Sequence, residues 1–272
     1  MKPIINISFS GGRTSAYMAY MLKTHLSDEY DFVVTFANTG LEHPKTLEFV
    51  QNCDIHYGLK VVWLEAVVNQ KKGIGTRYKK VTFDTASKNG EPFEAMIKKY
   101  GFPNQSYPHC TRELKLAPIY SYLKAEVGEY QSTAIGIRND ERRRVSDKAL
   151  ANKIIYPLVD MWPTDKIEIL DFFKTQPFDL GIEEFEGNCL GCFKKSRKKQ
   201  FLQIDKDPTA FDFFREMERK YQKDRVFFRG NMDTRALFEL HRETRSSQLF
   251  DHFGNDYENG GCSESCEILP MK

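Results

Sequence analysis

The sequence lacks any apolar run close to the roughly 18 residues that a membrane-spanning helix needs, so we expect no membrane span and no membrane partner. It also lacks a strong charge of either sign. The 40 Lys and Arg nearly balance the 38 Asp and Glu, which gives a formal net charge of +2 and predicts no overall attraction to polyanions. No signal-peptide core precedes the first strand pattern, so we expect a cytoplasmic protein. A hydrophobic fraction of 40% over 272 residues is enough for a folded core.

Two common phosphate-binding patterns are missing as well, the GK[ST] of Walker loops and the GxGxxG of dinucleotide-binding folds. A different glycine loop is present. Residues 10–15 read SGGRTS, between an expected strand at 4–8 and an expected helix at 14–25. Paired glycines let a ligand approach the backbone, and the start of a helix offers N–H groups and a dipole that favour an anion. The loop is either a tight strand-to-helix turn or a phosphate site, and we favour the phosphate site.

Strand and helix patterns alternate along the first part of the chain, which predicts an α/β fold with a parallel sheet. The expected strands are 4–8, 32–37, 60–64, 132–137 and 154–158, and the expected helices are 14–25, 44–56, 91–100, 114–127 and one that Thr164 caps. The polar stretch 68–89 has no clear period and is predicted to be a mobile loop over a site. Beyond residue 178 the pattern becomes helical and cysteine-bearing, so we expect one domain at 1–178 and a second part at 179–272.

The cysteines are placed unevenly: Cys53 and Cys110 stand alone, Cys189 and Cys192 form a CxxC, and Cys262 and Cys266 form a CxxxC near the end. In a reducing cytosol a disulfide framework is disfavoured, so metal, cluster or redox chemistry is the leading interpretation. A CxxC by itself is compatible with zinc, an iron–sulfur cluster, a redox pair or none of these.

Five segments between residues 8 and 170 carry motifs: SFSGGRTS, FANTGLEHPKTLEF, CTRELKLAP, GIRNDERRR and YPLVDMW. In the same order they resemble the SGGxDS, DTGYLFPETYRF, CxxxKxxPL, GxRxxES and PLxDW segments of the phosphoadenylylsulfate (PAPS) reductase-like family. That family belongs to the adenine nucleotide α-hydrolase superfamily, also called PP-loop or N-type ATP pyrophosphatases. The resemblance implies a Rossmann-like, HUP-type nucleotide-binding core with a parallel sheet, followed by a helical part that carries cysteines.

The resemblance also implies an adenine nucleotide, PAPS or ATP, across the carboxyl ends of the strands. Its phosphates would lie on the glycine loop, and the end of the next strand would approach it. The nucleotide-binding candidates are Ser8, Ser10, Gly11, Gly12, Arg13, Thr14, Ser15, Asn38, Thr39, Gly40 and Gly136. Thr14 stands where the family has Asp, which leaves the use of Mg²⁺ open.

A second anion-binding group is predicted from basic residues, most of which follow the expected strand at 132–137. Guanidinium groups bind phosphate and sulfate through two parallel hydrogen bonds, in a geometry that lysine cannot copy. The candidates for this clamp are Lys115, Arg138, Arg142, Arg143 and Arg144. The alternative is a solvated helix start on which Asp140 and Glu141 neutralise the arginines.

Iron–sulfur members of the family hold a [4Fe–4S] cluster with a cysteine pair in the CxxxKxxP segment and a later CxxC. The ligands that this implies here are Cys110, Cys189 and Cys192, with Cys262 or Cys266 as the fourth. His109 stands where the family has the other cysteine of the pair, and is a further candidate for the fourth position. Structural zinc and the absence of any metal stay open as alternatives.

The family attacks sulfur with a cysteine on a C-terminal segment, in an ECGLH motif that is absent here. Cys262 and Cys266 occupy a similar place on a polar, glycine-containing tail, and they are the implied catalytic thiols. The basic stretch 194–199 is either a nucleic-acid-binding surface or a solvated helix face, and a solvated helix face is the commoner case.

The leading hypothesis is a PAPS-reductase-like oxidoreductase in which arginines hold the distal anion and a tail thiol takes the sulfur-containing group. Its partners would be an adenine nucleotide and a thiol or electron-donor protein. The alternative is an ATP-dependent sulfurtransferase that adenylates and thiolates a nucleic acid or a nucleotide. A second alternative is a non-catalytic accessory protein that binds a nucleotide. The sequence gives no prediction of the oligomeric state.

Overall fold

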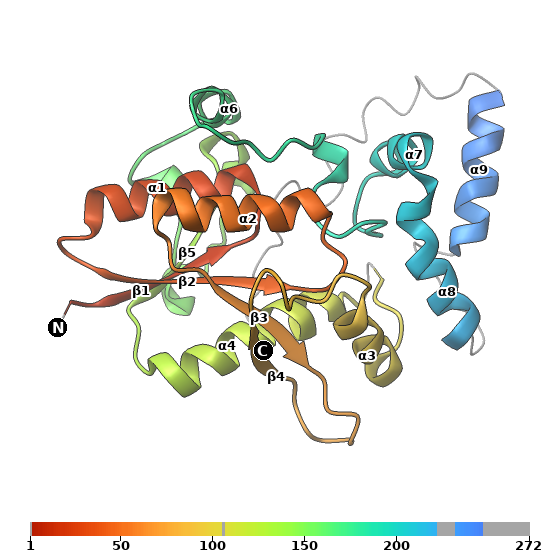
Figure 1. Ribbon diagram of the computed structural model, residues 1–272, viewed down its shortest axis with the longest axis horizontal. Coiled ribbons are helices and arrows are strands. Elements are labelled where there is room, and N and C mark those ends of the chain that lie inside the picture. The colour runs from red at the N-terminus through yellow and green to blue at the C-terminus, as the bar shows by residue number, and fades with distance from the viewer. Residues whose placement is uncertain (1, 105–106, 222–231, 247–272) are drawn as a thin grey trace.

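A six-stranded sheet forms the centre of the computed structural model, which describes residues 2–104, 107–221 and 232–246 (Figure 1). The strands are β1 (Ile4–Phe9), β2 (Asp31–Asn38), β3 (Val62–Val67), β4 (Arg77–Val81), β5 (Ser132–Ile135) and β6 (Ile154–Ile155), in the order β4-β3-β2-β1-β5-β6. All neighbouring strands are parallel except β3 and β4, which are antiparallel. The predicted parallel, Rossmann-like α/β core is confirmed.

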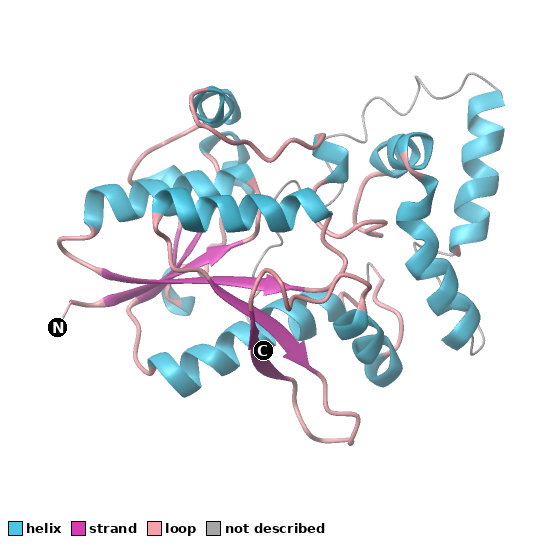
Figure 2. Ribbon diagram, in the orientation of Figure 1, coloured by secondary structure: helices cyan, strands magenta, loops and turns pink. Residues whose placement is uncertain are grey.

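Helices cover both faces of the sheet, as a parallel sheet requires (Figure 2). The described helices are α1 (Arg13–Leu26), α2 (Pro44–Tyr57), α3 (Glu91–Tyr100), α4 (Ala117–Tyr122), α5 (Pro157–Asp160), α6 (Lys166–Lys174), α7 (Arg197–Lys206), α8 (Asp212–Tyr221) and α9 (Thr234–Ser246). Figure 1 shows α1 and α2 on one face and α4, flanked by π-helical turns at Thr111–Leu116 and Leu123–Val127, on the other. None of the helices in these ranges is both long and apolar enough to cross a bilayer.

The main core lies between the sheet and the α1–α2 layer. Ile5 and Ile7 of the central strand β1 are buried, and they belong to one apolar cluster with Leu22 of α1 and Val50 of α2. These residues recur at strand and helix periods in the sequence, which is why the pattern located the elements correctly. The carboxyl ends of β1, β2 and β3 point to the same edge of the sheet.

Three local predictions are wrong. The stretch 68–89 is not a loop throughout, because its polar residues 77–81 form β4, an edge strand on β3. The cap of α6 is Asp165, which forms a capping box with Glu168, whereas the Thr164 hydroxyl donates to the Trp162 carbonyl oxygen. The expected strand at 154–158 ends at Ile155, because a short helix begins at Pro157.

A second apolar cluster joins the two parts of the chain. Phe93 of α3 packs edge-on against Phe213 and Phe214 of α8, with ring centroids 5.7 and 5.5 Å apart. Gly90, which precedes α3, lies directly under the Phe213 ring, where an added Cβ would be 2.3 Å from a ring carbon. The division near residue 178 stays a prediction, and apolar side chains from both sides of it share this cluster.

Candidate functional site

The glycine loop lies where β1 ends and α1 begins. Gly11 has a φ of +82°, and an added Cβ there would lie 2.7 Å from Cγ2 of Thr46, so this position needs glycine. The Ser10 backbone N–H donates to the Ser15 hydroxyl oxygen at 3.2 Å, which closes the turn. The helix begins at Arg13 after Gly12, with no side-chain cap and no acidic residue in its first turn. Its first N–H groups and its dipole therefore suit an anion.

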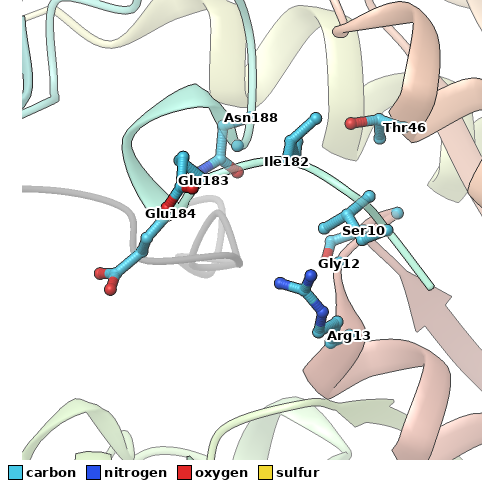
Figure 3. Close-up of a pocket in the computed structure, with 11 residues that line it drawn as sticks. Ser10, Gly12, Arg13, Thr46, Ile182, Glu183, Glu184 and Asn188 are labelled. Atoms are coloured by element: carbon cyan, nitrogen blue, oxygen red, sulfur yellow. The ribbon is translucent and has the colours of Figure 1, made fainter. Parts of the chain in front are cut away.

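A pocket opens beside this loop (Figure 3). The glycine loop and Thr46 of α2 line it on one side, and Glu183, Glu184 and Asn188 line it on the opposite side. Thr46 is 3% exposed, and its hydroxyl oxygen has no hydrogen-bond partner in the described part of the chain. Leaving a buried hydroxyl unpaired costs about 1–3 kcal/mol, so this group is a candidate to bond a ligand atom. Thr46 was not among the predicted residues, because nothing in the sequence distinguishes it from an ordinary first-turn threonine.

The other predicted nucleotide-binding residues near this loop have structural partners. Ser8 precedes the loop within β1 and pairs with the neighbouring strands. The Arg13 guanidinium makes two hydrogen bonds to the Asp179 carboxylate, at 2.6 and 2.8 Å. Gly136 lies so close to α1 that an added Cβ would be 3.1 Å from the Cα of Ser15. Gly136 thus allows α1 to start directly against the end of β5.

The predicted residues at the end of β2 form a rigid turn. Asn38 is fully buried, and its amide donates to Oε1 of Glu65 at 2.7 Å. The backbone N–H groups of Thr39 and Gly40 donate to Oε2 of Glu42 at 2.9 and 3.1 Å. The Thr39 hydroxyl donates to Oε1 of the same carboxylate at 2.9 Å. Asn38 and Gly40 therefore shape this turn, while Thr39 also reaches a second pocket.

This second pocket, called here the cysteine pocket, brings together the three cysteines that the sequence grouped. It is lined by Thr39, Phe93, Cys110, Thr111, Lys115, Asn188, Cys189, Cys192, Phe193, Lys194 and Phe214. The Cys189 sulfur lies 3.3 Å from the Thr39 hydroxyl oxygen and 3.9 Å from Oε1 of Glu42. The Leu190 N–H donates to the Leu41 carbonyl oxygen at 2.8 Å, which fixes the CxxC hairpin to the end of β2.

Charged groups surround the cysteine pocket. Burial raises the pKa of Glu42, although the Lys115 ammonium and the Thr39 donors act in the opposite direction. Burial lowers the pKa of Lys195 to about 8, although the nearby thiols of Cys192 and Cys189 raise it. Lys115 therefore belongs with the cysteines and is not part of an arginine cluster.

The predicted metal site can be tested on this geometry. Cys110, Cys189 and Cys192 share one pocket, as ligands of one cluster must. Within residues 2–104, 107–221 and 232–246, however, no group of three or more His, Cys, Asp or Glu is arranged to hold a metal ion. Cys262 and Cys266, the implied catalytic thiols and fourth ligand, lie outside the described residues. The described residues alone do not make a metal site, and the cluster stays a prediction.

The glycine-loop pocket and the cysteine pocket share one residue, Asn188. Its backbone has a φ of +63°, a left-handed conformation that asparagine tolerates better than most residues. Asn188 directly precedes Cys189, so the same hairpin closes both pockets. A phosphate on the glycine loop and a thiol in the cysteine pocket would therefore be neighbours.

Comparison with known proteins identifies a relative of nearly the same length. The chain is 32% identical over 278 residues to the uncharacterized nin region protein ORF290 of Escherichia phage lambda, covering 97% of this chain and 94% of the phage protein. The chain belongs to the ORF290 family. No family model matches it.

More distant similarities link the ORF290-family chain to longer proteins. It is 28% identical to the uncharacterized proteins MJ0066 and MJ0973 of Methanocaldococcus jannaschii, over 71% and 70% of this chain but only 36% and 40% of theirs. A solved structure, the U34-tRNA thiolase NcsA from Methanococcus maripaludis with its [4Fe–4S] cluster, has a TM-score of 0.41 and 16% identity, covering 82% of this chain and 74% of that one. A likeness of that degree carries no conclusion about function.

In this ORF290-family chain the predicted arginine clamp is dispersed. Arg138 is 6% exposed, and its guanidinium lies 3.3 Å from the Thr14 hydroxyl oxygen and 2.9 Å from Asp140. Arg144 pairs with Glu141 at 2.9 Å. Arg142 and Arg143 are exposed, and Arg142 donates to a backbone carbonyl. Among these arginines, the described contacts place Arg138 at the glycine loop, beside Thr14.

The basic stretch 194–199 is not a uniform solvated face. Lys195 and Lys199 are buried, and their ammonium groups bond to Gln203 at 3.1 Å and to Glu184 at 2.7 Å. Lys194 lines the cysteine pocket and donates to the Thr111 hydroxyl at 2.9 Å. These lysines, which follow the CxxC hairpin, connect it to Thr111, Glu184 and Gln203.

Proposed function

We propose that this chain is an ATP-dependent enzyme that transfers sulfur to an acceptor. ATP would place its phosphates on the glycine loop, and a cysteine thiol in the cysteine pocket would deliver the sulfur. One observation carries this proposal: Asn188 lines both pockets, so the anion site and the thiols are adjacent. Neither pocket alone supports more than binding.

The phosphate end of the nucleotide is assigned to the start of α1 and to Thr46. The N–H groups of the first turn of α1 and the unpaired Thr46 hydroxyl would donate to phosphate oxygens. Arg138, buried and paired with Asp140, would hold the start of α1 in place through its hydrogen bond to the Thr14 hydroxyl. The Arg13–Asp179 pair holds the first turn of α1 to residue 179 and so keeps the pocket wall in place.

The chemical sequence has two steps. An acceptor oxygen attacks the α-phosphorus of ATP, and pyrophosphate leaves with its electron pair, so the acceptor carbon is activated as an adenylate. A persulfide on one cysteine, loaded by an external sulfur donor, then attacks that carbon through its terminal sulfur and AMP leaves. A second cysteine attacks the cysteine sulfur of the resulting acceptor disulfide, which releases the thiolated acceptor. The disulfide left on the enzyme needs an external thiol reductant. The CxxC hairpin offers two such thiols.

A second candidate is reduction of a sulfated adenine nucleotide, the reaction that the sequence resemblance favours. The observation in its favour is the burial of Arg138 beside the glycine loop. Its charge is already matched by Asp140 at 2.9 Å and Glu141 at 3.5 Å, so it has less capacity for an additional sulfate. We therefore place ATP-dependent sulfur transfer first.

The test compares ligands on the purified protein. Isothermal titration should show ATP binding that is lost in Gly11→Ala, and release of labelled pyrophosphate from ATP should depend on an added acceptor. Tighter binding of PAPS than of ATP, with sulfite release on adding a thiol, would instead support the reductase. ATP binding without pyrophosphate release under every acceptor tried would support the accessory-protein alternative.

A further inference from the structure

The hairpin between β3 and β4 is strongly basic at its tip. Between residues 66 and 81 it carries five Lys and Arg and no acidic residue. Glutamates pair with the lysines further along β4. Lys71, Lys72 and Arg77 are exposed, and no carboxylate within the described ranges pairs with them. Figure 1 shows this hairpin projecting from the sheet beside α3.

A stack of aromatic rings lies next to the hairpin. The ring of Tyr107, which is 64% exposed, lies nearly parallel to His109, with centroids 6.0 Å apart and an interplanar angle of 20°. His109 in turn stacks on Tyr100 at 6.0 Å and 30°. The Lys99 ammonium and the Arg112 guanidinium lie 4.9 and 5.6 Å from the Tyr100 centroid.

The hairpin and the ring stack form one surface. The Lys99 ammonium donates to the Ile74 carbonyl oxygen at the hairpin tip. The Thr76 hydroxyl donates to Glu113, which also pairs with the neighbouring Arg112. We call residues 71–77, 98–100 and 107–112 the basic–aromatic surface. Cys110, the next residue after His109, lines the cysteine pocket, so this surface leads directly to the proposed sulfur-transfer site.

We propose that the basic–aromatic surface binds the acceptor, a single-stranded nucleic acid, by stacking an unpaired base on Tyr107 and holding phosphates with the hairpin lysines. This inference rests on the proposed function, because it names the acceptor class. An exposed ring supported by further rings and flanked by cations is a platform for a base face, and bases in a duplex do not present that face. Lysines without carboxylate partners suit the repeated negative charge of the backbone.

The experiment measures fluorescence anisotropy of labelled single strands of about 20 nucleotides, as RNA and as DNA, against a duplex of the same sequence, without ATP. The single strand should bind more tightly than the duplex. Whichever of single-stranded RNA and DNA binds more tightly identifies the nucleic acid that the surface recognises. Tyr107→Leu should weaken binding about 10-fold with an unchanged salt dependence. Lys71→Ala with Lys72→Ala should lower the slope of log K against log salt by about 1.4, since each phosphate contact on a single strand contributes about 0.7.

The matched control is Lys124→Ala with Lys148→Ala, which removes the same charge from exposed positions elsewhere. The proposal would be overturned if the Tyr107 and hairpin variants bound the single strand as tightly as wild type does, or if the control variant weakened binding equally. It would also be overturned if the duplex bound as tightly as the single strand, or if the protein bound anionic vesicles but no nucleic acid. ATP titration separates the two proposals. If nucleic acid binds as expected but ATP does not, the proposed function fails and this surface stands. If ATP-dependent pyrophosphate release proceeds while the Tyr107 and hairpin variants have no effect on nucleic-acid binding, only this surface fails.

Discussion

Replacing Thr46 by valine tests the nucleotide site through two measurements that should move in opposite directions. Thr46→Val keeps the shape of the side chain and replaces a buried hydroxyl that has no partner in the described part of the chain. Such a hydroxyl costs about 1–3 kcal/mol, so the free energy of unfolding should stay the same or rise by about 1 kcal/mol. If the hydroxyl donates to a phosphate, its loss removes about 1.5–3 kcal/mol of binding. The Kd for ATP should then rise roughly 10- to 100-fold.

Urea denaturation of the apo protein and isothermal titration with ATP provide the two readouts. Thr46→Ser is the matched control, because it keeps the hydroxyl and loses only the methyl group next to Gly11. It should bind ATP within a few-fold of wild type and lose about 0.8 kcal/mol of stability for the missing carbon. A valine variant that binds ATP as wild type does, or one that loses stability without losing affinity, would refute the assignment of this hydroxyl to a phosphate.

Three other predictions address separate parts of the molecule. Gly11→Ala should abolish ATP binding in the same titration, whereas Gly58→Ala, also at a positive φ but with no atom near the added Cβ, should lose only about 1–2 kcal/mol of stability; equal effects on ATP would contradict this. Cys192→Ser should lose iron from protein purified without oxygen if the predicted cluster exists, and an iron content equal to wild type would rule that cluster out. Burial alone would raise the pKa of Glu184, but its two lysine partners outweigh burial and lower it from 4.5 to about 2. Its stabilisation is therefore present above about pH 4.5 and lost as the pH falls toward about 2, so acid should destabilise Glu184→Gln less than wild type, and parallel pH curves would show that the ion pairs contribute nothing.

Much of the fold could be predicted because the spacing of apolar residues along the sequence reveals most of its helices and strands. The continuous apolar run of β2 and the helical spacing of α2 can be recognised in the sequence without any tertiary information. The edge strand β4 reads RYKKV: Arg77 is exposed, and the consecutive Lys79 and Lys80 pair with glutamates, so the strand shows no alternating apolar pattern. Such a strand exists because β3 offers it a hydrogen-bonding edge, which is a tertiary cause.

The candidate site was predictable only in part, for a related reason. The glycine loop is a local motif, and its place between β1 and α1 follows from neighbouring residues. The grouping of Lys115 with the cysteines depends on the packing of the CxxC hairpin against the end of β2, which no local pattern encodes. Thr46 could not be found at all, because its distinguishing property is the absence of a partner among the residues around it.

The second apolar cluster has a consequence for how the chain is completed during synthesis. Thr39 and Cys189 meet in the cysteine pocket although they are 150 positions apart, and Phe214 also lines that pocket. A chain made from its N-terminus can form the sheet around β1 and β2 early, but the wall of the cysteine pocket closes only after residue 214 has left the ribosome. A ligand that needs this complete wall can therefore bind only after α8 has folded, and premature termination before α8 would leave Phe93 and its neighbours exposed to aggregation.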